Sequence, residues 1–331
     1  MHPRLVTLLR CPACGGRLSL SGDPASGTLD AGELGCLGCG AAYPIIRGIP
    51  RFVPLENYAG SFGFQWNRFR RTQLDSVTGT TISRDRFLTF TGWKPEELAG
   101  KLVLDVGCGA GRFAEVALSL GARVVAVDYS GAVDACSANL GRQPGLDVVH
   151  ADIYRLPFEP GNFDFVYCLG VLQHTPDVAA AFRSLPPQVK PGGRLAVDVY
   201  AKLALNWLWP KYWLRPLTRR LPPDLLFRMV ERAVPVLLPV SERLRRTPLF
   251  GGRLRYLVPV ANYRGVFPLD DAQLAEWAVL DTFDMLSPRY DRPQSVATLQ
   301  GWFERAGLQD VWAGRLGFVV GRGTKPALPA A

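Results

Sequence analysis

Hydrophobic and polar positions in the middle of the chain alternate between strand-like and helix-like segments. Apolar runs without internal alternation, such as residues 124–127, are typical of strands buried on both faces of a parallel sheet. The pattern predicts strands at 102–107, 123–128, 146–151, 163–169 and 194–200, and helices near 111–120, 130–140 and 176–186.

The end of the chain completes this pattern. Residues 295–306 have the spacing of an amphipathic helix closed by Gly307, and residues 308–313 and 316–321 form two further strands as a hairpin. We therefore expect an α/β fold with a doubly wound, seven-stranded Rossmann-like sheet. In such a sheet, ligands bind at the carboxyl ends of the strands.

A glycine-rich turn follows the first predicted strand, in the sequence DVGCGAG at residues 105–111. Gly107, Gly109 and Gly111 let the backbone approach a ligand closely because they carry no Cβ atom. The second predicted strand ends in Asp128. A glycine turn followed at this distance by an acid is typical of a nucleoside site, with the carboxylate on the ribose hydroxyls.

NAD and S-adenosylmethionine are the two candidate cofactors for such a site. A dinucleotide turn requires its third glycine three residues after the second, and that position holds Arg112. A charged side chain there would crowd the pyrophosphate, and no second nucleotide-binding half follows. The spacing therefore favours S-adenosylmethionine.

Four of the seven cysteines form two CxxC pairs near the amino terminus: Cys11 with Cys14, and Cys36 with Cys39. Two such turns supply the four thiolates of a tetrahedral zinc site. The alternative is a pair of redox motifs, but neither pair follows a strand of a βαβ unit. The three other cysteines, Cys108, Cys136 and Cys168, are expected to be reduced packing residues.

Two known families resemble parts of this sequence. Residues 1–55, with YPI at 43–45 and GIP at 48–50, resemble the small Trm112-type zinc ribbon, which is a structural or partner-docking module for methyltransferases. The rest resembles class I S-adenosylmethionine-dependent methyltransferases, of the type 11 kind. Five segments carry this likeness in order: 105–111, Asp128, 151–153, 163–174 and 190–194.

The second resemblance implies roles for individual residues. Asp105 and the backbone of the glycine turn would hold the methionine end of the cofactor, Asp128 the ribose, and Asp152 the adenine amine. The cofactor-binding set that follows is Asp105, Gly107, Cys108, Gly109, Gly111, Asp128, Tyr129, Asp152, Ile153 and Leu169.

The implied reaction is in-line transfer of a methyl group from the sulfonium to a nucleophile, which depends on alignment and exclusion of water. His174 is the candidate base for a hydroxyl acceptor. It has a structural alternative, in which it bonds the turn at 175–177. Asp198 and Tyr200, at the end of the fifth strand, are alternatives that face the same region.

The aromatic segment 58–69 precedes the core. It is either a packing segment between the ribbon and the core or a lid over the cofactor, and the sequence does not separate these readings. Residues 84–100 then predict a helix with a turn at 93–95.

The insert at 201–266 carries a net charge of +10, whereas the whole chain carries +9. We expect short, proline-broken amphipathic helices that form a cap over the carboxyl ends of the strands. An ordinary acceptor cap, a peripheral membrane contact and a lipid-linked anionic acceptor all fit this composition. The many Leu, Val and Pro residues argue against a nucleic-acid groove.

Residues 281–293 predict a polar loop beside the acceptor, with Asp284, Tyr290 and Asp291 as candidate contacts.

The expected domains are a zinc ribbon (1–55), a linker with helices (56–100), a cofactor-binding core (101–200), the cap insert (201–266) and the completion of the core (267–331). The apolar run at 5–9 is too short for a signal peptide, and no uncharged run of about 20 residues is present, so a cytoplasmic protein is expected, with membrane association as an addition.

The sequence thus predicts a methyltransferase acting at oxygen or nitrogen of a small-molecule or lipid-linked acceptor, with S-adenosylmethionine and structural zinc. The alternatives are an rRNA or tRNA methyltransferase and a non-catalytic cofactor-binding protein that docks a partner.

Overall fold

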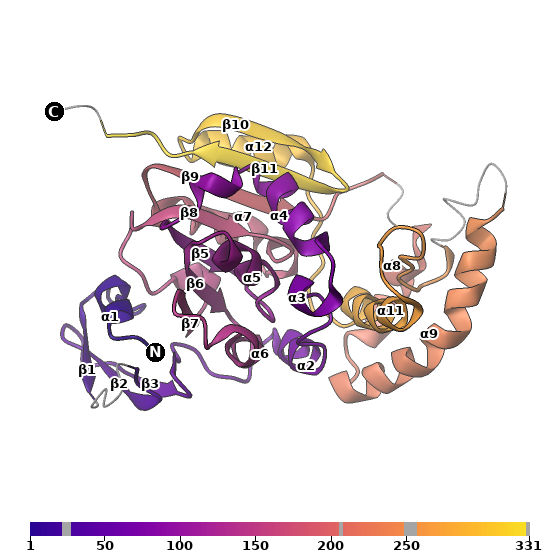
Figure 1. The fold of residues 1–331 in the computed structure, drawn as a ribbon, viewed down its shortest axis with the longest axis horizontal. Coiled ribbons are helices and arrows are strands. Elements are labelled where there is room, and N and C mark those ends of the chain that lie inside the picture. Colours follow the sequence, from indigo (N-terminus) through magenta and orange to yellow (C-terminus); the bar gives the residue numbers. More distant parts are fainter. Residues whose placement is uncertain (22–27, 205–207, 248–256, 329–331) are drawn as a thin grey trace.

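The computed structural model describes residues 1–21, 28–204, 208–247 and 257–328 (Figure 1). Its centre is a seven-stranded sheet in the order β10-β11-β9-β8-β5-β6-β7. Five strands are parallel: β5 (Leu102–Val106), β6 (Arg123–Asp128), β7 (Leu146–His150), β8 (Phe163–Cys168) and β9 (Val189–Val199). The hairpin of β10 (Gln309–Leu316) and β11 (Phe318–Thr324) adds to β9 in the antiparallel sense. This is the predicted Rossmann-like methyltransferase sheet.

Two layers of helices bury the two faces of this sheet. On one face lie α4 (Ile82–Thr91), α5 (Arg112–Ser119) and α6 (Ala132–Leu140), whose apolar side chains share a core with Val103, Val124 and Phe165. On the other face, α7 (Val178–Arg183) and α12 (Val296–Arg305) share a core with Leu104 and Val125. Successive strand residues thus face opposite layers, which explains why these runs are apolar throughout.

The amino-terminal ribbon packs on the edge of the sheet at β7. It consists of α1 (Arg4–Leu8) and a four-stranded antiparallel sheet of β1 (Leu18–Ser21), β2 (Ala31–Cys36), β3 (Ala42–Ile46) and β4 (Ile49–Pro50). Arg51 pairs with His150 as a parallel bridge, and the Phe52 amide donates to the His150 carbonyl at 2.9 Å. The ribbon therefore covers an edge strand whose backbone groups would otherwise be unpaired.

Helices that lie outside the sheet layers gather at one end of the molecule (Figure 1). They are α8 (Pro210–Thr218), α9 (Pro223–Arg245) and α11 (Asp271–Leu286), and α2 (Gly60–Arg68) lies between them and α6. Phe227, Trp277 and Phe283 belong to the separate apolar core that α2, α9 and α11 share. Short elements α3 (Asp75–Thr78), η1 (Pro95–Glu97), η2 (Ile153–Arg155), η3 (Leu172–His174) and η4 (Pro186–Gln188) complete the connections.

The insert differs from its prediction in helix length. Instead of several proline-broken pieces, α9 runs unbroken for 23 residues with Pro235 and Pro239 inside it. Both prolines lie on its exposed side, whereas Leu226, Val230 and Val234 are buried against the cap core. Burial of this apolar face outweighs the backbone hydrogen bonds that the prolines remove.

The polar loop predicted at 281–293 is also corrected. The helix α11 continues to Leu286, so Asp281 and Asp284 are helical residues three positions apart. Trp277, Phe283 and Leu286 maintain the buried helical face. The two acids make this part of the helix look like a polar loop in the sequence, because they occupy helix positions that line the cavity described below.

Two other segments named from the sequence are a matching segment at 190–194 and a tryptophan of the insert. The strand predicted at 194–200 begins earlier, since β9 also includes residues 190–194, where its pairing with β8 is irregular. Trp207, one of the tryptophans of the insert, lies outside the described residues.

Candidate cofactor and acceptor cavity

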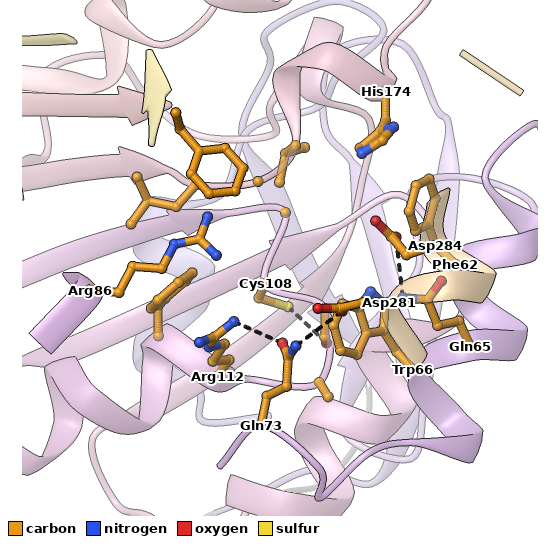
Figure 2. A pocket seen from close by; sticks show the side chains of 18 of the residues that line it. Phe62, Gln65, Trp66, Gln73, Arg86, Cys108, Arg112, His174, Asp281 and Asp284 are labelled. Carbon is orange, nitrogen blue, oxygen red and sulfur yellow. Dashed lines mark hydrogen bonds between the residues drawn. The ribbon is translucent and has the colours of Figure 1, made fainter. Parts of the chain in front are cut away.

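A cavity of about 650 Å³ opens at the carboxyl ends of the parallel strands (Figure 2). Its walls come from the ends of β5, β6, β8 and β9, and from α2, α4 and α11. This volume falls in the range of ligand-binding clefts, about 300–1,000 Å³. The sheet and the cap therefore meet around one site.

The glycine turn lies at this cavity and tolerates no side chain. Gly107 has φ +87°, and a Cβ there would lie 2.2 Å from the side chain of Val171. Gly111 has φ +92°, and its Cβ would lie 2.7 Å from the side chain of Leu140. Both the backbone conformation and the close packing require glycine.

Asp128 closes the turn from the end of β6. One carboxylate oxygen accepts from the Gly109 amide at 2.9 Å, and the other accepts from the amide and hydroxyl of Ser130, each at 2.8 Å. A carboxylate offers about four lone-pair positions, so one remains for a ligand hydroxyl. Its place at the cavity wall fits the predicted ribose contact.

Asp105 has an unusual environment at the end of β5. It is 2% exposed, and its Oδ2 atom has no hydrogen-bond partner among the described residues. Burial raises the pKa of this carboxyl group to about 8. Asp105 is not among the residues that line the cavity, so its unpaired oxygen lies beneath the surface that a ligand would contact.

The remaining predicted cofactor residues divide into two groups. Cys108, Tyr129, Ile153 and Leu169 line the cavity. Asp152 is next to it, and its carboxylate accepts from the Tyr154 amide at 3.0 Å at the start of η2. Burial raises the pKa of the Asp152 carboxyl group.

His174, the candidate base, also lines the cavity and is almost buried. Its Nδ1 atom lies 3.0 Å from the Tyr290 carbonyl oxygen. A carbonyl only accepts, so Nδ1 carries the hydrogen and Nε2 of the neutral ring is an acceptor. Its ring packs 5.0 Å from Phe62 and 5.3 Å from Tyr200, measured between centroids.

The other candidates at the end of β9 have different environments. Asp198 is fully buried, pairs with Arg86 at 2.9 Å and accepts from the Gly170 amide. Tyr200 lines the cavity, and burial raises the pKa of its phenol well above the usual range.

The aromatic segment before the core forms α2, whose rings contact the cap and the glycine turn. Its Phe64 packs against Phe227 and Phe283 of the cap. Its Trp66 indole lies over the glycine turn, since a Cβ on Gly109 would be only 3.2 Å from it. One helix thus joins the cap to the cofactor side of the cavity.

Sequence reasoning missed two arginines that line the cavity, Arg86 and Arg112 (Figure 2). Arg86 donates to Asp198, while its buried Nε has no partner among the described residues. Burial, together with the nearby Arg86, lowers the pKa of Arg112 to about 9. No local signal singled out Arg86, because its helix also carries Arg84 and Asp85.

A polar network links Arg112 to α11. Arg112 donates to the Gln73 amide oxygen at 2.9 Å, and the Gln73 amide nitrogen lies 3.4 Å from Asp281. Asp281 also accepts from Tyr263 and, at 3.1 Å, from Trp277. Burial raises the pKa of Asp281 to about 6. These donors satisfy Asp281, so we assign it a structural role.

The four predicted zinc ligands converge in the ribbon. The sulfur atoms of Cys11, Cys14, Cys36 and Cys39 all lie within 4.8 Å of one another. Cys36 Sγ accepts from the Gly38 and Cys39 amides at 3.4 Å, and these bonds lower the pKa of its thiol to about 6. The donor set fits a structural zinc ion, which binds thiolates in a tetrahedron.

The sheet order and the glycine turn define a Rossmann-like methyltransferase fold with a Trm112-like ribbon. Residues 104–197 match the family model of a methyltransferase domain, and residues 2–48 match that of Trm112p-like proteins.

Among curated proteins, the chain is similar to ubiquinone biosynthesis O-methyltransferases. It is 41% identical to that of Thiobacillus denitrificans over 115 residues, which cover 34% of this chain and 49% of the relative. It is also 41% identical to that of Azotobacter vinelandii over 101 residues, 30% of this chain and 44% of the relative. The chain thus spans about half the length, or less, of these curated relatives.

Solved structures with a similar fold include human N-acetylserotonin methyltransferase in complex with SAM, at 17% identity and a TM-score of 0.45, covering 83% of this chain and 61% of that one. A complex of the Haloferax volcanii Trm112 methyltransferase activator with a methyltransferase has 15% identity and a TM-score of 0.45, covering 80% and 97%.

Proposed function

We propose that this protein transfers a methyl group from S-adenosylmethionine to oxygen or nitrogen of a small-molecule acceptor. The observation that carries the proposal is the pair of carboxyl groups flanking the glycine turn: Asp128 at the cavity wall and Asp105 with its unpaired buried oxygen. The similarity to curated O-methyltransferases supports the same reaction class.

In the proposed complex, different residues bind different parts of the cofactor. Asp128 binds the ribose hydroxyls, and Asp105 faces the amino group of the methionine moiety. Arg86, whose Nε is unpaired, binds the methionine carboxylate. When bound, the cofactor supplies the electrophilic methyl group. Tyr129, Ile153 and Asp152 then surround the adenine.

The residues of α2 and α11 align the acceptor and exclude water, which are the main sources of rate in such a transfer. In its neutral form, His174 directs its hydrogen from Nδ1 to the Tyr290 carbonyl oxygen, so Nε2 is the atom that takes a proton from the acceptor hydroxyl. The aromatic rings of Phe62 and Trp66 reduce the water around the reacting atoms.

Calorimetry with S-adenosylmethionine tests the proposal directly. We expect binding at one site per chain, and absence of binding by the zinc-loaded, folded protein would refute it. Incubation with labelled cofactor and cell extract, with and without ribonuclease, then separates a metabolite acceptor from RNA. Label that disappears from the product after ribonuclease would favour the RNA methyltransferase alternative.

For the whole chain we propose the division predicted from the sequence: ribbon 1–55, lid segment 56–100, core 101–200, cap 201–266 and completion 267–331. The ribbon would stabilise the core in the same chain, through its pairing with β7 and the ion pair of Arg4 with Asp147 at 3.4 Å.

We further propose that the cap contacts a lipid surface and that the acceptor is lipid-linked. Along α9, an exposed stripe of Leu225, Met229, Val236 and Val240 lies beside Arg228, Arg232 and Arg243, which are also exposed. Apolar and cationic residues on one solvent face are typical of interfacial helices. None of the helices in the described residues has the length and apolar character needed to cross a membrane.

Not all of the cap's charge is available for this contact. Lys211 and Arg215 are buried, and Lys211 pairs with Asp291 at 3.0 Å. Arg215 donates to the carbonyl oxygens of Met285 and Pro288, each at 2.9 Å. These two cations attach α8 to the end of α11 and to the segment that follows it, so the lipid contact rests on the exposed arginines of α9 and the residues before it.

A further inference from the structure

The part of the cavity formed by α2 and α11 contains a carboxylate with unused hydrogen-bonding capacity. Asp284 accepts from the Gln65 amide nitrogen on one oxygen and from the Tyr200 hydroxyl on the other, each at 3.2 Å (Figure 2). Since a carboxylate has about four lone-pair positions, two remain open. Asp284 lines the cavity, so a ligand there can reach them.

Two further acceptor atoms lie in the same region. The Gln65 side-chain oxygen is buried and has no hydrogen-bond partner among the described residues. In the neutral His174 ring, Nε2 is an acceptor because Nδ1 donates to the Tyr290 carbonyl oxygen. Hydrogen-bond acceptors at these three residues require a ligand group that donates.

The surrounding charges and rings restrict that ligand further. Arg86 and Arg112 line the same cavity, and this disfavours an ammonium group. A carboxylate or phosphate would be repelled by Asp284. The rings of Phe62 and Tyr200 pack on the His174 ring at 5.0 and 5.3 Å, so the three form one continuous ring-lined surface of the cavity, which favours contact with an aromatic ligand.

We propose that Asp284 and Gln65 bind a hydroxyl group of a neutral, hydroxylated aromatic methyl acceptor. Asp284 is thus a specificity-determining residue that comes from the carboxyl-terminal part of the chain, outside the matched methyltransferase domain. This inference rests on the proposed methyltransferase function, whose acceptor it specifies.

The test compares two probes, catechol and 1,2-dimethoxybenzene, which share a ring but differ in hydroxyl donors. Binding is followed by NMR titration of the zinc-loaded full-length protein, with and without S-adenosylhomocysteine. We expect the wild type to prefer catechol by about tenfold or more, as for hydrogen bonds to a charged group. Asp284→Asn should reduce this preference to about threefold or less, and Gln65→Met should reduce it partly.

The matched control is Asp271→Asn, an exposed acid on the same helix that pairs with Arg264. It should leave the preference unchanged. An Asp284→Asn protein that loses affinity for both probes equally would indicate a structural role and overturn the inference, as would an unchanged preference. If Asp284→Asn does not fold, Gln65→Met decides alone: an undiminished preference refutes the proposal.

Failure of the proposed function has a different signature. In that case S-adenosylhomocysteine does not bind, whereas the catechol preference and its dependence on Asp284 are still measured in the protein without it.

Discussion

The two carboxyl groups at the glycine turn behave differently although both end a parallel strand. Asp128 has partners on both oxygens and lies at the cavity wall, whereas Asp105 is buried with one oxygen unpaired. Asp128 therefore contributes to the shape of the turn before any ligand arrives. In the proposed complex, the amino group of the cofactor would supply the partner that the Asp105 oxygen lacks.

Replacing Asp128 should weaken cofactor binding. We expect Asp128→Ala to lose about 1.5–3 kcal/mol of binding free energy, because hydrogen bonds to a charged group are lost. Calorimetry with S-adenosylhomocysteine measures this loss, and Asp224→Ala on the exposed side of α9 is the control. Equal affinity of Asp128→Ala and the wild type would show that the ribose assignment is wrong.

The raised pKa of Asp105 predicts a pH dependence of the same binding. Below its pKa of about 8 the carboxyl group is protonated and must release its proton to pair with a cationic amino group. Affinity should therefore rise from pH 6 to pH 8, by at most about tenfold per pH unit for one proton. Titrations of the wild type and Asp105→Asn check this, and equal pH profiles for the two would contradict it.

The raised pKa of Asp105 also makes the stability of the folded protein depend on pH. The folded Asp105 holds its proton above the ordinary carboxyl pKa, so the folded state binds more protons than the unfolded state between the ordinary value and about pH 8. Its contribution to stability therefore declines as pH rises through this interval.

Helix α2 contacts both the cap and the glycine turn, which lie on different sides of the cavity. Its Phe64 face packs on the cap, and its Trp66 covers Gly109 of the turn. Movement of this helix would expose the cofactor side of the cavity, so α2 has the position of a lid.

Shortening the covering side chain should speed cofactor release. For Trp66→Ala we expect the dissociation rate of S-adenosylhomocysteine to rise by about three- to tenfold, since an aromatic contact contributes about 0.5–1.5 kcal/mol. Stopped-flow displacement measures this rate. Arg70→Ala, an exposed residue just after the same helix, is the control, and a rate in Trp66→Ala equal to that of the control would rule out the lid role.

For the whole molecule, the ribbon and the core share one apolar cluster that includes Leu5, Leu34 and Val149. A sheet as small as the ribbon depends on metal for much of its stability. The ribbon should therefore hold one zinc ion per chain, and its loss should loosen the edge at β7.

Cys36→Ser tests this dependence. We expect loss of zinc, measured by elemental analysis, and faster proteolysis within the ribbon. Cys136→Ala in α6 should keep the zinc because Cys136 lies in the core, away from the cluster. Full zinc retention by Cys36→Ser would exclude the four-cysteine site.

We expect the outer face of the cap to bind membranes that contain anionic lipid. The wild type should co-sediment with vesicles containing anionic lipid, and changing Arg219, Arg220, Arg232 and Arg243 to Glu should reduce the bound fraction severalfold. Each basic residue near an anionic surface contributes about 1 kcal/mol. Partitioning of both proteins to the supernatant would remove the lipid proposal.

The sequence by itself determined the core sheet, the glycine turn and the cysteine cluster. Each depends on a local rule: unbroken apolar runs, positive φ at glycine, or thiolates spaced on two turns. Local rules fail where tertiary contacts reverse them, as in α9, whose buried Val230 and Val234 outweigh its prolines.

Only the tertiary structure decided which groups share the cavity. Gln65 and Asp284 are 219 residues apart in sequence, and Arg86 joins them from a third helix. No periodicity predicts such a meeting, because it depends on how α2, α4 and α11 pack at the end of the sheet. The glycine turn specifies the cofactor side locally, while long-range packing forms the acceptor side.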